Sequence, residues 1–531
     1  MSERSTQTRQ QGALSWLPWL LIVIPVGFLA SSAGTTDAGA PTPSALGSAD
    51  DGVAQPPGAD AAMVTEQQAP AAPMAQIAPK KSLAELKGEA ALDQDLLGRL
   101  MCVFGMLAMI GVAWLFSENR RAMPWRLVMT GTGLQLLFAI VVLKTAAGRQ
   151  VFSVANDAIA ALLSFSTQGA RFLFGNLVDM SVPVGQTVSL PHAASVVLQP
   201  TSWATTGAFI AFNVLPTILF FSALMAALYY VGIMQFIVRL ISAAMQRTMG
   251  TSGAETTSVA SNIFLGQTEA PLLVKPYLDQ MTRSELMAVM VAGFATVAGG
   301  VMAAYVGMLQ TTFPDIAGHL LAASVMGAPA SLVMAKIMIP ETQTPATLGD
   351  KSIALPKVDS NFLDAVTRGT SEGLTLAMNV GAMLITFIAL ISLLNAGLAG
   401  IGSVVGVEGF SLEWIFGRVG APLALVLGVP WEDATTVGSL IATKTVVNEF
   451  VAYQQLAALL AQGEIHHGKS VVIATYALCG FANFGSIGIQ IGGLAAMAPG
   501  RRADVARLGL RAMVCGAIAT FQTAAIAGLF L

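Results

Sequence analysis

Long apolar stretches recur along the chain between residue 100 and the C-terminus, separated by shorter polar segments. A helix that crosses the hydrocarbon core of a bilayer needs about 20 consecutive apolar residues. By that measure the pattern predicts spans at residues 100–116, 127–143, 208–225, 286–309, 317–338, 374–394, 470–494 and 508–530. The expected fold is therefore an all-α polytopic membrane protein with about eight transmembrane helices.

Amphipathic stretches lie between several of these spans. Residues 151–180 keep polar side chains at helical spacing, which is typical of an interfacial helix, and 359–372 and 409–418 are also expected at the membrane interface. The stretch 419–429 is apolar but too short to cross the bilayer. The loop 117–126 carries three arginines, which places it on the cytoplasmic side by the positive-inside rule.

The N-terminal region differs from the rest of the chain. Residues 1–33 combine two arginines, an apolar stretch and small residues where a signal peptidase would cleave, so they resemble a secretory signal; an uncleaved anchor is the alternative. Residues 34–90 form an Ala/Pro-rich segment that is expected to be a disordered tether, exported to the extracytoplasmic side. Residues 91–531 would then form the membrane core.

A polar segment with a carboxylate interrupts the apolar pattern at about residues 250–277. It contains Gln267, Thr268 and Glu269, shortly before the apolar run that begins at residue 286. A carboxylate at the bilayer centre costs roughly 2.5 to 3.5 kcal/mol on insertion scales, so Glu269 is expected to face a wet cavity or a partner rather than lipid. A purely structural role, as a cap or staple between helices, is the alternative.

A second polar segment of the same kind, at about residues 434–459, contains Asn448 and Glu449. A glycine-interrupted apolar helix follows each polar segment, broken near 296–300 and 481–486. Two re-entrant helical hairpins, each followed by a broken helix, are typical of transporters built from repeats with their site at the midplane. Three predicted spans separate the hairpins, an odd number, so the two halves should form inverted repeats.

The composition supports a membrane protein and excludes several other classes. The chain of 531 residues is 54% hydrophobic and only 11% charged, against roughly 25% charged in soluble domains. Its net charge of −3 gives no basic field for a nucleic acid partner. The three cysteines lack metal or disulfide spacing.

Amide and hydroxyl side chains accompany both glutamates. Such donors and acceptors suit a neutral solute rich in hydroxyl groups, because each polar group needs a partner once it is desolvated. At these residues the chain resembles the concentrative nucleoside transporter family. The matching segments are Ser117-Glu118-Asn119-Arg120, Gly266-Gln267-Thr268-Glu269-Ala270-Pro271-Leu272, Phe294-Ala295-Thr296-Val297-Ala298-Gly299, Val447-Asn448-Glu449-Phe450-Val451-Ala452-Tyr453 and Ala477-Leu478-Cys479-Gly480-Phe481-Ala482-Asn483.

The resemblance implies a homotrimer in the lipid bilayer, whose protomer has a static scaffold and a moving transport domain. It also implies a nucleoside substrate and no enzymatic activity. The residues implied for the nucleobase are Gln267, Thr268, Glu269 and Val301; those for the ribose are Glu449, Asn483 and Ser486, with Phe481 packed against the ligand.

The family's sodium site falls on four further positions: Asn262, Leu265, Thr296 and Val297. Their neutral oxygens suit a hard monovalent cation and do not titrate near neutral pH. Na+ is therefore the expected coupling ion. Proton coupling through Glu269 is the alternative, and a membrane-embedded enzyme or a channel are the competing functions. The expected location is the plasma (inner) membrane, as a multi-pass protein.

Overall fold

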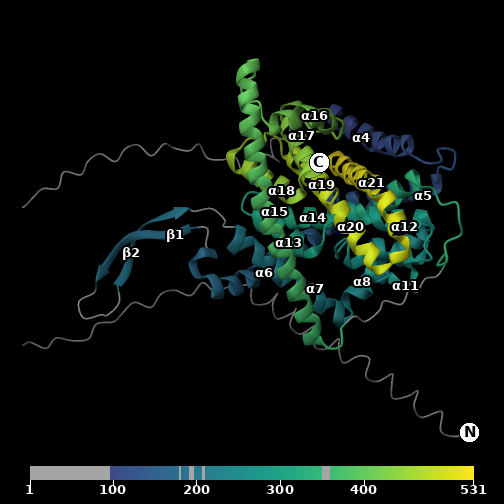
Figure 1. The fold of residues 1–531 in the computed structure, drawn as a ribbon, viewed down its shortest axis with the longest axis horizontal. Helices are drawn as coiled ribbons and strands as arrows, with labels where there is room; N and C mark the ends of the chain where they lie inside the picture. The colour runs from purple at the N-terminus through teal and green to yellow at the C-terminus, as the bar shows by residue number, and fades with distance from the viewer. Residues whose placement is uncertain (1–95, 179–180, 190–195, 206–209, 350–358) are drawn as a thin grey trace, which may run out of the picture. The chain divides into compact units, whose positions relative to one another are not determined.

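The computed structural model describes residues 96–178, 181–189, 196–205, 210–349 and 359–531, and helices dominate these ranges (Figure 1). The predicted signal or anchor (1–33) and the tether (34–90) lie outside the described residues. The first elements are α4 (Leu96–Leu115), α5 (Trp125–Lys144), α6 (Ala146–Phe174), η1 (Gly175–Val178), β1 (Ser181–Ser189), β2 (Val196–Thr205), the π-helical η2 (Ile210–Val214), α7 (Leu215–Val231) and α8 (Ile233–Met249).

Two similar series of elements follow. The first is α9 (Gly253–Ser261), α10 (Glu269–Leu272), α11 (Lys275–Leu278), α12 (Arg283–Ala295), α13 (Gly299–Leu309) and α14 (Ile316–Met338), after which comes α15 (Phe362–Val405). The second is α16 (Leu412–Val426), α17 (Trp431–Val446), α18 (Glu449–Gln462), α19 (Gly468–Leu478), α20 (Phe484–Met497), η3 (Pro499–Arg501) and α21 (Arg502–Leu529).

The number of membrane-spanning helices agrees with the sequence. In the described part of the chain, seven helical segments are long and apolar enough to cross a membrane, and they match seven of the eight predicted spans. The predicted span 470–494 falls instead on the two shorter apolar helices α19 and α20, whereas the pair α16 and α17, bent by 114°, would be an eighth span. The prediction of a helical polytopic membrane protein with about eight spans is confirmed. Each series contains a helical hairpin and a broken helix. Below, hairpin 1 is α9 to α11 and hairpin 2 is α17 to α18.

Two segments predicted at the membrane interface belong to longer helices, and their place at the interface stays a prediction. Residues 359–372 do not form a separate element, because α15 runs unbroken from Phe362 for 44 residues. Its polar start is stabilised within the helix: Asn361 caps it, and Arg368 bonds both Asp359 and Glu372. Residues 409–418 and 419–429 likewise belong mostly to one helix, α16.

A two-stranded antiparallel sheet is the one described departure from the all-α prediction. β1 pairs with β2 from Ser181 opposite Thr205 to Ser189 opposite Val196, with an irregularity at Val184/Gly185. Both segments are rich in valine and threonine, whose branched side chains favour strands. A search for long apolar stretches passes over this region, because neither strand is long enough to resemble a span.

Capping boxes fix where α9 and α12 begin. Ser252 and Glu255 exchange side-chain and backbone hydrogen bonds at the start of α9, and Thr282 and Glu285 do so at the start of α12. Lys336 near the end of α14 lies 2.8 Å from a Glu255 carboxylate oxygen. Hairpin 1 is thereby tied to α14 at its base, which leaves its turn as the part available for a site.

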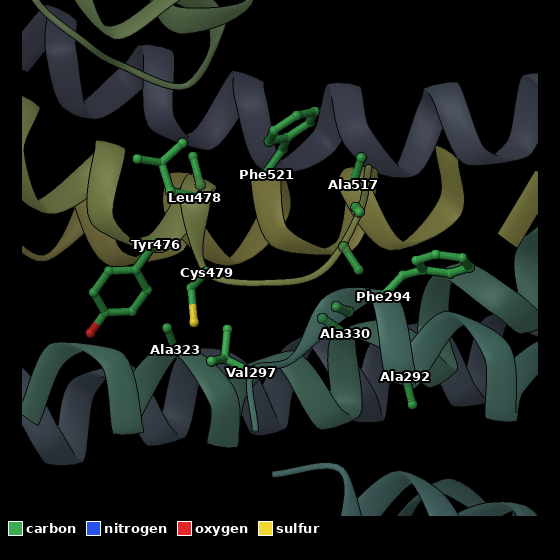
Figure 2. Close-up of a cluster of buried hydrophobic side chains, with 14 of the residues drawn as sticks. Ala292, Phe294, Val297, Ala323, Ala330, Tyr476, Leu478, Cys479, Ala517 and Phe521 are labelled. Carbon is green, nitrogen blue, oxygen red and sulfur yellow. The ribbon is translucent and has the colours of Figure 1, made fainter. Parts of the chain in front are cut away.

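The two broken helices lie beside each other between α14 and α21. Break 1 comprises residues 296–298 and break 2 residues 479–483. Figure 2 shows the Cys479 side chain of break 2 pointing towards Val297 of break 1 and Ala323 of α14. Gly480 has φ +144°, and a Cβ there would lie 2.6 Å from the Phe294 carbonyl oxygen. Only glycine allows the two breaks to approach this closely.

Candidate functional site

Glu449, the first residue of α18, lies at the centre of a buried hydrogen-bonded group. The Tyr305 hydroxyl of α13 donates to Glu449 Oε1 at 3.1 Å, and the Asn483 amide donates to Oε2 at 2.7 Å. Glu449 is 6% exposed and Asn483 4%. An ionised carboxylate has about four acceptor positions, so about two remain after these bonds. The remaining positions can accept the hydroxyl groups of a ligand.

Asn483 also begins α20. Its side-chain oxygen accepts a hydrogen bond from Ser486 N at 2.8 Å, while its nitrogen holds Glu449. Asn448 caps α18 in the same way through Val451 N at 2.9 Å. The N-terminal ends of two helices, which carry partial positive charge, therefore meet at the Glu449 carboxylate. Their dipoles favour the ionised form of this buried group.

Tyr305 was not among the residues chosen from the sequence. It is fully buried, its ring is stacked on Tyr453 of α18 with centroids 4.3 Å apart, and Phe450 packs edge-on at 5.6 Å. These aromatic contacts fix the position of the Tyr305 hydroxyl, which donates a hydrogen bond to Glu449. The available signal was a lone tyrosine in the apolar run after break 1.

The turn of hairpin 1 packs against α12 and α20. A Cβ at Gly293 of α12 would lie 2.8 Å from Gln267 Cβ, and one at Gly493 of α20 would lie 2.7 Å from Thr268 Cγ2. Gln267 is buried, Thr268 half-buried and Glu269 exposed. Larger residues at the two glycines would push the turn away, so the glycines set the depth at which the Gln267, Thr268 and Glu269 side chains sit.

Gln490 of α20 is a second residue that the sequence analysis missed. Its amide nitrogen donates to the Met290 carbonyl at 2.8 Å, and it is 1% exposed. The side-chain oxygens of Gln490 and Gln267 are both buried and accept no hydrogen bond within the described residues. Since a buried acceptor without a donor is costly, the two amides favour a ligand that carries N–H or O–H groups. The signal in the sequence was a single amide within an apolar helix.

One face of α20 connects the two polar groups. Ser486, Gln490 and Gly493 are spaced by four and three residues, which places them on the same side of a helix. The first follows Asn483 and the Glu449 group, and the other two lie against the turn of hairpin 1. In the described residues no hydrogen bond or ion pair joins Glu269 to Glu449 directly.

Neutral oxygens lie on both segments where the turn of hairpin 1 meets break 1. The Phe264 carbonyl accepts from Gly299 N at 2.9 Å, which fastens the turn to the break. Asn262 is fully buried; its nitrogen donates to Ser258 O at 3.1 Å, and its oxygen accepts no hydrogen bond from the described chain. The Thr296 hydroxyl donates to Ala292 O at 2.8 Å, so its lone pairs stay available. This donor-free set fits a hard monovalent cation.

The remaining predicted residues occupy these same elements. Leu265 is half-buried in the turn of hairpin 1, and Val297 is fully buried in break 1. Val301 is 4% exposed in the first turn of α13, and Phe481 is half-buried in break 2. The predicted residues thus come from the two hairpins, the two breaks and the helices that follow the breaks.

Two series of elements, each with a helical hairpin followed by a broken helix with polar groups, are typical of a membrane carrier built from repeats. Three family models match the chain: Na+ dependent nucleoside transporter N-terminus at residues 104–177, Nucleoside recognition at 211–312, and Na+ dependent nucleoside transporter C-terminus at 319–528. The chain belongs to the concentrative nucleoside transporter family, which is sodium-dependent. Its members are transporters rather than enzymes.

Relatives at about 40% identity cover most of the chain. An uncharacterized transporter of Haemophilus influenzae is 43% identical over 438 residues, 81% of this chain and 98% of that protein. Solute carrier family 28 member 3 of Mus musculus is 40% identical over 453 residues, 82% of this chain and 60% of that protein. The structure of CNTnw in an inward-facing substrate-bound state has a TM-score of 0.71 and 40% identity, covering 81% of this chain and 97% of that one.

Proposed function

We propose that this protein is a sodium–nucleoside symporter that imports nucleosides by an elevator-type alternating-access movement in the plasma (inner) membrane. The observation that carries the proposal is the pairing of two chemically different groups in one unit. Oxygen acceptors at Asn262 and Thr296 lie next to the turn of hairpin 1, and the same turn packs against α20, which also reaches the Glu449 group. Cation and nucleoside would then stabilise the same arrangement of hairpin and helix.

Glu449, Asn483 and Ser486 would bind the ribose in this proposal. The support is the count of acceptor positions on Glu449, of which about two are left for the two ribose hydroxyls. Phe481 in break 2 would pack against the sugar or base. The ribose hydroxyls would donate to the carboxylate, and the positive ends of α18 and α20 would favour its charged form.

Gln267, Thr268 and Glu269 would bind the nucleobase, with Val301 lining that side. The support is the turn's packing against α20 and the two buried amide oxygens of Gln267 and Gln490 that accept no hydrogen bond. Base N–H groups can donate to such oxygens. We add Gln490 to the nucleobase group on this ground.

Na+ would be held by the Asn262 and Thr296 side chains and the Leu265 and Val297 carbonyls. The bound ion supplies the positive charge that this acceptor set lacks. It would also brace the turn of hairpin 1 against break 1, which the Phe264 to Gly299 hydrogen bond already joins. Sodium binding would thereby complete the nucleoside pocket, because Gln267 is only three residues beyond Phe264.

The elevator movement, the trimer and the topology rest on the family. Structures of CNTnw include an inward-facing substrate-bound state and an outward-facing state, the two orientations that alternating access requires. We infer a homotrimer in which hairpins 1 and 2 are re-entrant and move with the transport domain. The tether would lie on the extracytoplasmic side, opposite the arginine-bearing loop 117–126.

Uptake of labelled uridine into proteoliposomes at clamped voltage tests the proposal. An inward sodium gradient should drive uphill accumulation, and an inward proton gradient in sodium-free buffer should not. Glu269→Gln should abolish accumulation, whereas Asp279→Asn at the exposed end of hairpin 1 should leave it unchanged. Accumulation driven by protons without any response to sodium, or uptake that never exceeds equilibrium, would contradict the proposal.

A further inference from the structure

Lys444 in the last turn of α17 is fully buried, and the Glu449 carboxylate attracts its charge without a direct ion-pair contact. Its ammonium group donates to the Ala477 carbonyl of α19 at 2.8 Å and to the Thr520 hydroxyl of α21 at 3.1 Å, and it lies 5.7 Å from the centre of the Phe521 ring. No ion pair involves it within the described residues. A buried charge is costly unless other groups compensate it, so the acceptors around Lys444 need an explanation.

The position of Lys444 corresponds to the sodium position of the first series of elements. In that series α9 is the first helix of hairpin 1, and its end at Asn262 meets the end of the half-helix α12 before break 1. In the second series, α17 is the first helix of hairpin 2, and its end at Lys444 meets the end of the half-helix α19 before break 2. Ala477 is the last residue but one of α19. Both places are the negative end of a half-helix.

The acceptors at the two places are also alike. Near break 1 the Thr296 hydroxyl donates to a carbonyl of its own helix at 2.8 Å and keeps its lone pairs. Near break 2 the Thr520 hydroxyl donates to the Ala517 carbonyl at 2.9 Å, and its oxygen accepts from Lys444. Each place thus offers a threonine oxygen and helix-end oxygens to a positive charge. The difference is that only the place near break 2 already contains a positive charge, the Lys444 ammonium.

We propose that the Lys444 ammonium is a built-in cation that occupies the repeat-related counterpart of the sodium site, so that each nucleoside is transported with one Na+. The inference rests on the proposed sodium coupling and adds its stoichiometry. A charge fixed to the chain travels inward with the loaded carrier and returns with the empty one. Lys444 therefore adds no net charge to the cycle, whereas a second Na+ at the same place would add one.

The wild-type protein gives the first test, without any substitution. In proteoliposomes with a fixed sodium gradient, the voltage at which net uridine flux stops is measured while the uridine gradient is changed tenfold. One Na+ per nucleoside predicts a shift of about 59 mV, and two predict about 30 mV. A shift of about 30 mV would overturn this inference but not the proposed function. Uptake that does not respond to sodium would instead overturn the proposed function.

Two substitutions at Lys444 give the second test. Lys444→Ser leaves space and adds a hydroxyl oxygen, so Na+ should enter and the shift should fall from about 59 mV towards about 30 mV. Lys444→Met fills the space without a charge and should lower uptake at least tenfold. Lys275→Met, at an exposed lysine of hairpin 1, is the matched control and should behave as the wild type. Near-normal uptake by Lys444→Met, or an unchanged shift in a transporting Lys444→Ser variant, would overturn the assignment.

Discussion

Replacing Glu449 by glutamine keeps the size of the side chain and removes its negative charge. In the wild type, Tyr305 and Asn483 donate to different oxygens of the carboxylate, at 3.1 and 2.7 Å. About two of its four acceptor positions therefore remain for ribose hydroxyls. In the variant the amide oxygen has about two positions, and Asn483 uses one of them. One position is left for the ribose.

The expected loss is one charge-assisted hydrogen bond to the ligand. Such bonds contribute about 1.5 to 3 kcal/mol. At 1.36 kcal/mol for each factor of ten, the dissociation constant for uridine should rise roughly 10- to 160-fold. 2′,3′-Dideoxyuridine lacks the 2′- and 3′-hydroxyls that would donate to Glu449 and keeps only the 5′-hydroxyl, so its dissociation constant should change less than about threefold.

Calorimetric titration of purified protein at saturating sodium would measure both constants. Dideoxyuridine serves as the internal control, because retained binding shows that the variant is folded. Glu464→Gln, at an exposed glutamate just beyond hairpin 2, is the matched control and should leave both constants unchanged. An equal loss for both ligands would mean that Glu449 holds the fold rather than the ribose. An unchanged constant for uridine would remove Glu449 from the site.

Two further substitutions test the sodium group and the helix breaks. Thr296→Ala removes one neutral oxygen, worth about 1 kcal/mol, so the sodium concentration for half-maximal uptake should rise about fivefold; an unchanged sodium dependence would exclude Thr296 as a ligand. Gly480→Ala forces an L side chain into φ +144° and against the Phe294 carbonyl. The resulting strain of about 1 to 3 kcal/mol should lower the melting temperature of the purified protein. Gly492→Ala is the control and should not lower it, because a Cβ added at Gly492 meets no other atom.

The sequence predicted those parts of the fold that interrupt its apolar pattern. Glu269 and Glu449 are conspicuous because carboxylates are rare within membrane segments, and the glycines near 296–300 and 481–486 located both breaks. The start of α15 was less visible. Its charged residues resemble an interfacial segment, and the bonds of Arg368 to Asp359 and Glu372 that let the helix continue can be recognised only once the backbone is placed.

The candidate site was predicted only in part for a similar reason. A single hydroxyl or amide in an apolar helix hardly changes its hydropathy, so Tyr305 and Gln490 passed as core residues. Their importance depends on what they meet across the fold: Tyr305 meets Glu449, 144 residues away, and Gln490 meets Met290, 200 residues away. The roles given to Val301 and Phe481 came from the family resemblance, because neither side chain has a polar group that would indicate a role in ligand binding.

Helix ends give one architecture two places of opposite partial charge. Near break 1 the ends of α9 and α12 are C-terminal, and they present carbonyls and negative partial charge to a cation. At Glu449 the ends of α18 and α20 are N-terminal, and their caps Asn448 and Asn483 leave positive partial charge beside a carboxylate. Because a broken helix has one end of each sign at its break, each break can hold a positive charge on one side and steady a negative one on the other. A continuous helix in either place would offer neither end, which gives a physical reason for keeping both breaks in a buried part of the membrane core.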